Sequence, residues 1–220
     1  MVLLSFLLSK ESMESCCIRV LLVLIATWAT IHIVHAQDQE GFISLDRGLP
    51  TYELSPYKEI TNGLWFSSDE KFIQSGNTGR SREIPERYTK QYETLRYFPN
   101  GTRNCYNLSV DKGRKYLIKA KFLYGNYDGL HIEPVFDLYL GPNLWATVDL
   151  VTMVNGTREE ILHVSTSSSL QICLVKTGTT TPVISTLELR PVVSGSYITE
   201  SGSLKLYDRY YLNKTGSRIR

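Results

Sequence analysis

The sequence has 220 residues, with 24 lysines and arginines against 22 aspartates and glutamates, so the formal net charge at pH 7 is only +2. The basic residues alternate with acidic ones instead of forming a basic stripe, which argues against a nucleic-acid partner. Hydrophobic residues make up 42% of the chain, which is typical of an ordinary folded domain and is enough for one core.

The N-terminus has the pattern of a secretory signal peptide. Arg19 is followed by an apolar run of about 15 residues, too short and too interrupted for a membrane span, which needs about 20. The run ends at Val34, and Ala36 before Gln37 offers a cleavage site. We therefore expect residues 1–36 to be a signal peptide, with Met13 as a better start than Met1. The alternative is a signal anchor that stays in the membrane.

Cysteine usage agrees with secretion. Cys16 and Cys17 lie in the signal segment, so the mature chain keeps only Cys105 and Cys173. Two cysteines in an oxidising compartment suggest one disulfide. The alternative is two separately buried thiols.

Four Asn-X-Ser/Thr sequons follow the signal segment. They are acceptors for N-glycosylation in a secreted protein, and most lie in turn-like stretches. Asn107 lies inside an alternating apolar stretch, so it can carry a glycan only if it faces outward. The four sites are Asn100, Asn107, Asn155 and Asn213.

Beyond Gln37 the chain consists of short runs rich in β-branched and aromatic residues, separated by turn residues. Several runs alternate, as in Tyr116, Ile118, Ala120 and Phe122, which predicts half-buried strands. Such runs favour an all-β sandwich or jelly roll of two antiparallel sheets. The expected strands are 42–45, 64–66, 94–98, 106–110, 115–124, 135–140, 145–151, 158–164, 170–176 and 183–190.

Two polar segments break this pattern. Residues 71–90 are rich in arginine and contain Gly76, Gly79 and Pro85. They predict a long surface loop that is mobile, forms a short helical turn, or binds a ligand. Residues 192–220 predict a linker and the start of a further unit, so we place the domain at residues 41–191.

Catalytic signatures are missing from the sequence. Only His131 and His163 remain in the mature chain, and neither a glycine-rich phosphate loop nor a paired-cysteine zinc motif occurs. Glu159 and Glu160 form a charged pair typical of a solvated turn. We therefore expect no enzyme, no catalytic residue, no metal and no cofactor.

The stretch from Phe122 to Gly129 is the strongest candidate for a binding site. It runs from a strand into a glycine-rich turn, and aromatic rings beside amide and carboxylate groups suit a sugar or a peptide. The alternative is a tight β-turn whose tyrosines pack on the edge of the sandwich. The candidate ligand-binding residues are Tyr124, Asn126, Tyr127 and Asp128.

Several sequence blocks occur in order and at consistent spacing. They are GFISLD (41–46), GLWFSSD (63–69) with Phe72-Ile73, LRYFP (95–99), NCYNL (104–108), the block 116–129, FDLYLG (136–141) and LELRP (187–191). Together these blocks resemble the malectin-like ectodomain of plant leucine-rich-repeat receptor-like kinases, and the resemblance covers residues 41–191. One departure is Arg47, where the family typically has a cysteine after Asp46, so family disulfides cannot be transferred directly.

The resemblance implies a malectin-like jelly roll. In plants, two such units usually precede leucine-rich repeats, a membrane span and a kinase, and this chain ends after the first unit. It implies a ligand-recognition module for a cell-wall carbohydrate or a secreted peptide, located outside the cell or on a cell-membrane ectodomain, with co-receptors or full-length receptor kinases as partners. In malectin, aromatic and acidic loop residues hold the sugar, and Tyr124, Tyr127 and Asp128 match that region. The alternative function is a truncated or decoy interaction protein with no ligand of its own.

Overall fold

The computed structural model describes residues 18–24, 39–86, 88–193, 195–197 and 202–207. The chain divides into two units, residues 1–41 and 42–220. In the first unit, residues 18–24 are helical. None of the helices in the described ranges is both long and apolar enough to cross a membrane.

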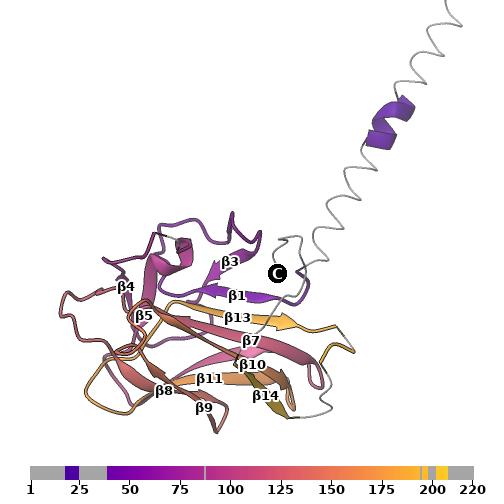
Figure 1. The fold of residues 1–220 in the computed structure, drawn as a ribbon. Helices are drawn as coiled ribbons and strands as arrows, with labels where there is room; N and C mark the ends of the chain where they lie inside the picture. Colours follow the sequence, from indigo (N-terminus) through magenta and orange to yellow (C-terminus); the bar gives the residue numbers. More distant parts are fainter. Residues whose placement is uncertain (1–17, 25–38, 87, 194, 198–201, 208–220) are drawn as a thin grey trace, which may run out of the picture. The chain divides into compact units, whose positions relative to one another are not determined.

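Strand β7 (Lys115–Phe122) lies near the middle of the larger sheet (Figure 1). Its alternate residues Ile118, Ala120 and Phe122 are fully buried. Because successive side chains of a strand point to opposite faces, Lys119 and Lys121 project from the other face. This strand thus contributes an apolar face to the core and a basic face to the outside of the sheet.

The larger sheet has seven strands in the order β14-β10-β7-β13-β1-β3-β2. Neighbouring strands are antiparallel except for β1 and β3, which pair in parallel. The other strands of this sheet are β1 (Ile43–Asp46), β2 (Tyr57–Lys58), β3 (Trp65–Ser68), β10 (Thr157–Val164), β13 (Thr186–Pro191) and β14 (Ser203–Leu206).

A four-stranded antiparallel sheet has the order β6-β11-β8-β9. A smaller three-stranded sheet has the order β12-β5-β4, and a short 3₁₀ helix, η1 (Lys90–Tyr92), precedes β5. These strands are β4 (Asn77–Arg80), β5 (Thr94–Tyr97), β6 (Arg103–Ser109), β8 (Val135–Leu140), β9 (Asn143–Asp149), β11 (Ser169–Lys176) and β12 (Val183–Ile184).

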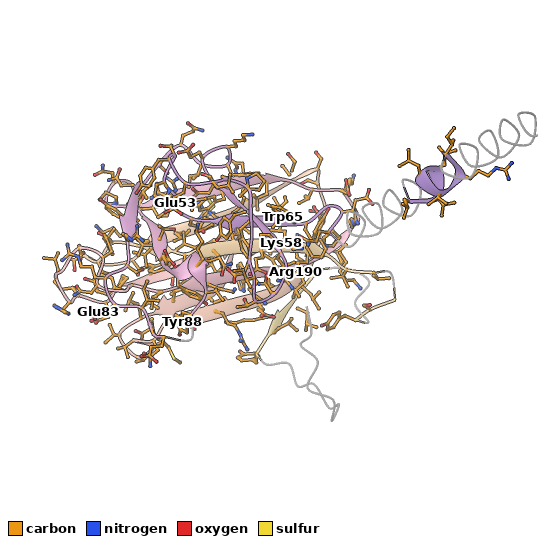
Figure 2. The ribbon with its side chains drawn as sticks, turned by 90° about the horizontal axis from the view of Figure 1, so that it is seen from above. Glu53, Lys58, Trp65, Glu83, Tyr88 and Arg190 are labelled. Atoms are coloured by element: carbon orange, nitrogen blue, oxygen red, sulfur yellow. A yellow bond between two sulfur atoms is a disulfide. The ribbon has the colours of Figure 1, made fainter. Side chains whose placement is uncertain are left out.

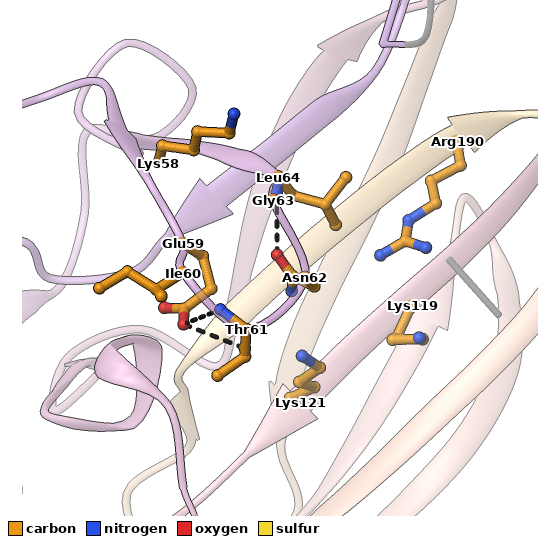
Figure 3. Close-up of a pocket in the computed structure, with 10 residues that line it drawn as sticks. All are labelled: Lys58, Glu59, Ile60, Thr61, Asn62, Gly63, Leu64, Lys119, Lys121 and Arg190. Carbon is orange, nitrogen blue, oxygen red and sulfur yellow. Dashed lines mark hydrogen bonds between the residues drawn. The ribbon is translucent and has the colours of Figure 1, made fainter. Parts of the chain in front are cut away.

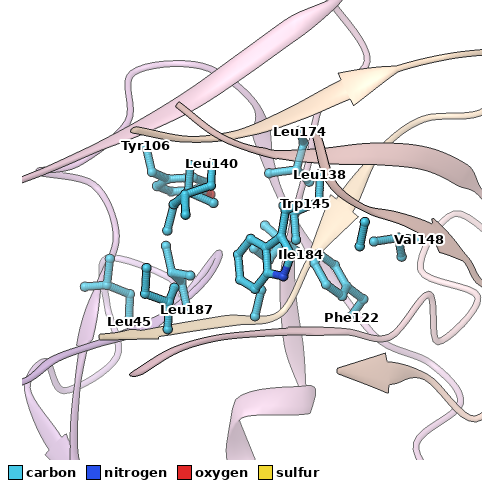
Figure 4. Packing of buried hydrophobic residues seen from close by; sticks show 14 of the residues in the cluster. Leu45, Tyr106, Phe122, Leu138, Leu140, Trp145, Val148, Leu174, Ile184 and Leu187 are labelled. Atoms are coloured by element: carbon cyan, nitrogen blue, oxygen red, sulfur yellow. The ribbon is translucent and has the colours of Figure 1, made fainter. Parts of the chain in front are cut away.

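The hydrophobic core lies between the seven-stranded and four-stranded sheets (Figure 4). Phe122 of β7 meets Phe136 of β8 edge to face, with ring centroids 5.7 Å apart. Such contacts combine burial of large apolar surface with favourable ring geometry. The predicted all-β sandwich is confirmed, since both sheets bury one alternating face in a common core.

Each of the ten expected strands corresponds to a strand in the structure, the last being divided into β12 and β13 at Ser185. The prediction of an unbroken loop over residues 71–90 was wrong, because Asn77–Arg80 form β4 and pair with β5. Residues 192–220 are also more than a linker, because Ser203–Leu206 form β14 and pair with β10. β4 (Asn77–Arg80) contains no apolar residue, so local pattern gave no reason to expect a strand there. In β14, Leu204 and Leu206 do alternate with Ser203 and Lys205, but these four residues lie in the segment predicted to be a linker.

Candidate functional site

The candidate turn follows directly from the end of β7. Gly125 and Asn126 both adopt left-handed backbone conformations, with φ of 51° and 48°. A Cβ on Gly125 would lie 2.6 Å from the Cβ of Ser81, so glycine is required for this close approach. The Gly125 carbonyl accepts hydrogen bonds from the backbone N–H groups of Arg82 and Glu83, at 2.7 and 3.1 Å. The segment that follows β4 therefore clamps the turn.

Tyr124 and Asp128 are bonded to each other within the turn. The Tyr124 hydroxyl donates to Asp128 Oδ1 and accepts from the Ile132 N–H at 3.2 Å. Asp128 Oδ1 also accepts from the Leu130 N–H at 3.1 Å. Burial, together with the Asp128 hydrogen bond, raises the pKa of Tyr124 to about 12. The phenol thus remains a protonated donor whose partner is inside the protein.

Asn126 is also turned inward. Its Nδ2 donates to Glu83 Oε1 at 2.8 Å, and its Oδ1 accepts from the His131 N–H at 3.2 Å. The side chain is buried in spite of its place in a turn. Its amide therefore ties together three segments of the loop region.

Tyr127 packs between two other tyrosines. Its ring centroid lies 4.7 Å from that of Tyr97 and 5.6 Å from that of Tyr124. Gly79 of β4 leaves room for this ring, because a Cβ there would approach Tyr127 Cδ2 to 3.0 Å. The structure thus brings all four candidate residues together, with only Asp128 exposed and Tyr127 half-buried.

A cavity of about 380 Å³ opens beside this turn. Glu83 and Glu133 give its wall an acidic character. The position of Glu83 is labelled in Figure 2. Sequence reasoning missed both glutamates, because they come from segments on either side of β5 to β7 with no motif of their own. The lining residues are Glu83, Ile84, Pro85, Leu123, Tyr124, Gly125, Asn126, Glu133, Val154 and Asn155.

Exposed apolar residues gather in two loops next to this cavity. The Leu150 N–H donates to the Pro134 carbonyl at 3.1 Å, which joins the loop after β9 to the segment before β8. Val154 of the first loop lines the cavity together with Glu133. We call this set the apolar rim; each member is more than half exposed, and they are Leu130, Ile132, Val151, Met153 and Val154.

A second cavity, of about 770 Å³, lies against the outer face of the seven-stranded sheet (Figure 3). The loop between β2 and β3 forms one wall, and Lys119, Lys121 and Arg190 project from β7 and β13. This cavity is basic where the first is acidic. No sequence motif indicated it, because its walls are about 60 to 130 positions apart in the chain.

Among the described residues, the remaining candidates lie away from both cavities, with one exception. Cys105 of β6 and Cys173 of β11 are direct cross-strand partners joined by a disulfide, with their Cα atoms 4.0 Å apart. Asn100, Asn107 and Asn155 are exposed, and Asn155 is the exception that lines the acidic cavity. Asn213 lies outside the described residues. No group of three or more metal-ligating residues occurs in the part of the chain that the structure describes.

These features define a β-sandwich domain with cavities formed by its loops and by one sheet face. The family model described as "Malectin-like domain" matches residues 45–220, and the chain belongs to this malectin-like family. A receptor-like protein kinase of Arabidopsis thaliana, At5g59670, is 67% identical over 201 residues, which are 91% of this chain and 23% of that protein. Another, At3g21340, is 54% identical over 200 residues, 90% of this chain and 22% of that protein. The chain thus spans about a quarter of the length of these relatives. The similarity therefore does not show that this chain has kinase activity.

Solved structures agree on the fold. The plant receptor-like kinase FER matches with a TM-score of 0.64 and 17% identity, covering 74% of this chain and 46% of that one. A structure of the plant peptide RALF23 in complex with FER and LLG2 matches with a TM-score of 0.58 and 15% identity, with the same coverage. At this identity the likeness concerns the fold alone.

Proposed function

We propose that this chain is a ligand-recognition module of a plant receptor-like kinase ectodomain and that it binds a secreted peptide at the acidic cavity and the apolar rim. The family membership and the receptor-kinase relatives support the first half of this proposal. The site observation that carries the second half is that Val154, a member of the apolar rim, lines the acidic cavity. Exposed apolar patches of this kind commonly mark interaction sites.

The chemistry of the turn favours a peptide over a carbohydrate. A sugar needs an accessible aromatic face and unoccupied amide or carboxylate partners. Here the Tyr124 hydroxyl bonds to Asp128, and the Asn126 amide bonds to Glu83 and to the His131 backbone. Two of the groups that would recognise sugar hydroxyls, the Tyr124 hydroxyl and the Asn126 amide, are thus already engaged within the protein.

The acidic walls favour a peptide with basic as well as apolar side chains. Glu83 and Glu133 line the cavity, and Val154 connects it to the apolar rim. Lysine side chains of the peptide would pair with the glutamates while leucine or valine side chains cover the rim. The FER complex with RALF23 and LLG2 supports by analogy both a peptide ligand and a co-receptor.

The proposal is tested with an acetylated and amidated octapeptide that alternates leucine and lysine, compared with one that alternates leucine and glutamine. We expect calorimetry on the secreted domain to show at least tenfold tighter binding of the lysine peptide. Glu133→Gln should weaken this binding at least fivefold, and Val154→Asp should abolish it. Leu54→Asp, at an even more exposed apolar site in another loop, is the control and should change nothing.

Equal affinity for both peptides, or equal effects of the Val154 and Leu54 variants, would remove the peptide proposal. A glycan array decides the carbohydrate alternative. Glycan binding that Tyr127→Ala abolishes would establish a sugar site at the turn instead.

We also propose that residues 1–36 direct the chain into the secretory pathway. The sequons and the disulfide support this placement outside the cytosol. N-terminal sequencing of the protein secreted from plant cells should find a start near Gln37. Retention of the full N-terminus in a membrane fraction would favour the signal-anchor alternative.

A second candidate function is that of a decoy that pairs with full-length receptors. Strand β9 lies at the edge of the four-stranded sheet, where backbone groups can pair with a strand of another chain. Co-purification with a full-length relative, lost on Thr147→Pro in β9 but retained on Val154→Asp, would support this function over peptide recognition.

A further inference from the structure

The basic cavity lies on the outer face of the seven-stranded sheet, and the side chains of Lys119, Lys121 and Arg190 form its floor. Lys119 and Lys121 alternate along β7 with core residues, so both point away from the core. Arg190 stands on the adjacent strand β13, and the loop 59–64 faces all three (Figure 3). With about 770 Å³, the space falls within the usual range for a ligand site.

Two buried carboxylates hold these cations in place. Glu188 Oε1 lies 3.1 Å from Lys121 Nζ, and Glu188 Oε2 accepts from Arg190 Nη2. Glu160 Oε1 lies 3.2 Å from Lys119 Nζ. Both glutamates are buried in the sheet surface, so they anchor the cations from below and do not reach the opening. Three cations therefore share two carboxylates, which leaves excess positive charge on the floor.

The end of β2, next to the facing loop, adds a further positive group. Lys58 is exposed and forms no ion pair with any of the described residues. The one carboxylate of the loop, Glu59, is directed elsewhere: it accepts from Gln91 Nε2 at 2.8 Å and from Thr61 Oγ1 at 3.0 Å. In addition, Arg190 Nε is buried without a hydrogen-bond partner among the described residues. The exposed Lys58 ammonium is therefore free to donate to an anion in the cavity.

The lining indicates which kind of anion fits. None of the residues that line this cavity is aromatic, so it lacks the ring on which a sugar would stack. Ile60 stands almost wholly exposed, at 97%, in the same loop and offers an aliphatic contact. A peptide with acidic and aliphatic side chains matches both features, whereas an acidic sugar matches only the charge.

We propose that this cavity is a second binding site, which takes an acidic peptide segment through its carboxylates. It goes beyond the proposed function, because its charge is opposite to that of the acidic cavity and it shares no lining residue with it. Carboxylates of the segment bind Lys58 and Arg190, and an aliphatic side chain covers Ile60.

The experiment uses the secreted domain and fluorescein-labelled octapeptides that alternate glutamate with leucine or glutamine with leucine. Anisotropy should show that the glutamate peptide binds at least tenfold more tightly, with an affinity that falls as salt is raised from 50 to about 300 mM. Lys58→Ala should weaken binding at least fivefold. Lys112→Ala, an exposed lysine in another turn, should have no effect.

Lys58 is exposed and lies outside the buried ion pairs, so its removal should leave the fold intact, which circular dichroism verifies. Lys121→Met provides a second variant on the floor, with the same expected weakening. Equal binding of both peptides, or equal behaviour of the Lys58 and Lys112 variants, would overturn the proposal. So would tight binding of a uronic acid oligomer without binding of the glutamate peptide. Val154→Asp should leave this binding unchanged, so failure here is distinguishable from failure of the proposed function.

Discussion

Arg47 lies directly over the ring of Tyr106, with its guanidinium carbon 3.2 Å from the ring centroid. Arg47 is fully buried, and its three guanidinium nitrogens have no hydrogen-bond partner among the described residues. Its nearest carboxylate, Asp69, is 4.0 Å away and is already held by Arg96 at 2.6 and 2.7 Å. Burial lowers the pKa of Arg47 to about 9 in spite of Asp69. The arginine at this position is therefore an incompletely compensated buried cation.

Replacing Arg47 by methionine should stabilise the domain by about 1–3 kcal/mol, because it removes the buried charge while filling similar space. Asp69 keeps its two bonds from Arg96 in this variant. Asp69→Asn should act in the opposite direction and cost about 3–5 kcal/mol, because two buried arginines lose their counter-ion. Urea unfolding monitored by fluorescence measures both. A loss of stability in Arg47→Met comparable to that in Asp69→Asn would show that the contact with Tyr106 outweighs the desolvation.

Glu188 should make the domain sensitive to acid. Burial alone would raise its pKa, but Lys121, Arg190 and Lys119 together lower it from 4.5 to about 2. Because the folded value lies below the unfolded one, Glu188 contributes stability above pH 4.5 and loses it as the pH falls toward 2. The loss should amount to roughly 3 kcal/mol.

The measurement is the free energy of unfolding between pH 2 and 6. Glu188→Gln should flatten the curve in this window and lower stability at pH 6, because Lys121 and Arg190 lose their partner. Parallel curves for the two proteins would contradict this assignment.

The disulfide between Cys105 and Cys173 should be a major stabilising element. The residues are 68 positions apart, and closing a loop of this length in the unfolded chain is worth about 4 kcal/mol. We expect the Cys105→Ser, Cys173→Ser double variant to show this loss in chemical denaturation. Dithiothreitol should have a comparable effect on the wild type and none on the variant, whereas an equal response of both would argue against the bond.

The sequons should differ in their effect on the acidic cavity. Asn100, Asn107 and Asn155 are exposed, and Asn107 faces outward from β6, where Gln171 donates to its Oδ1 at 2.9 Å. Only Asn155 lines the cavity. We expect mass spectrometry of the protein secreted from plant cells to find glycans at all three.

Asn155→Gln should then increase the affinity for the leucine–lysine peptide severalfold, because a glycan at the opening obstructs access. Asn100→Gln is the matched control and should leave affinity unchanged. Unmodified Asn155 in the secreted protein would rule out this effect.

Local patterns predicted much of this fold, because burial in a strand alternates with a period of two residues. The run from Tyr116 to Phe122 shows this directly, since Tyr116, Ile118, Ala120 and Phe122 face the core and its lysines face outward. The glycine-rich turn that carries Tyr124 and Asp128 was likewise expected, from the glycines that follow the end of this strand. The fold class and the candidate turn could therefore be predicted from the sequence.

Tertiary structure decided what these residues do. Strand β4 exists because β5 supplies its backbone partner, which no local pattern records, and β14 has a short alternating pattern but pairs with β10, which is distant in the chain. The Asn126 amide donates its hydrogen bond to Glu83, more than 40 positions away in the chain. The turn therefore has fewer free polar groups for a sugar than its composition suggests. Both cavities combine segments far apart in the chain, and Arg47 is buried only because of the elements packed around it. Such features depend on long-range contacts, whose geometry is set by the packing of whole sheets and not by the order of neighbouring residues.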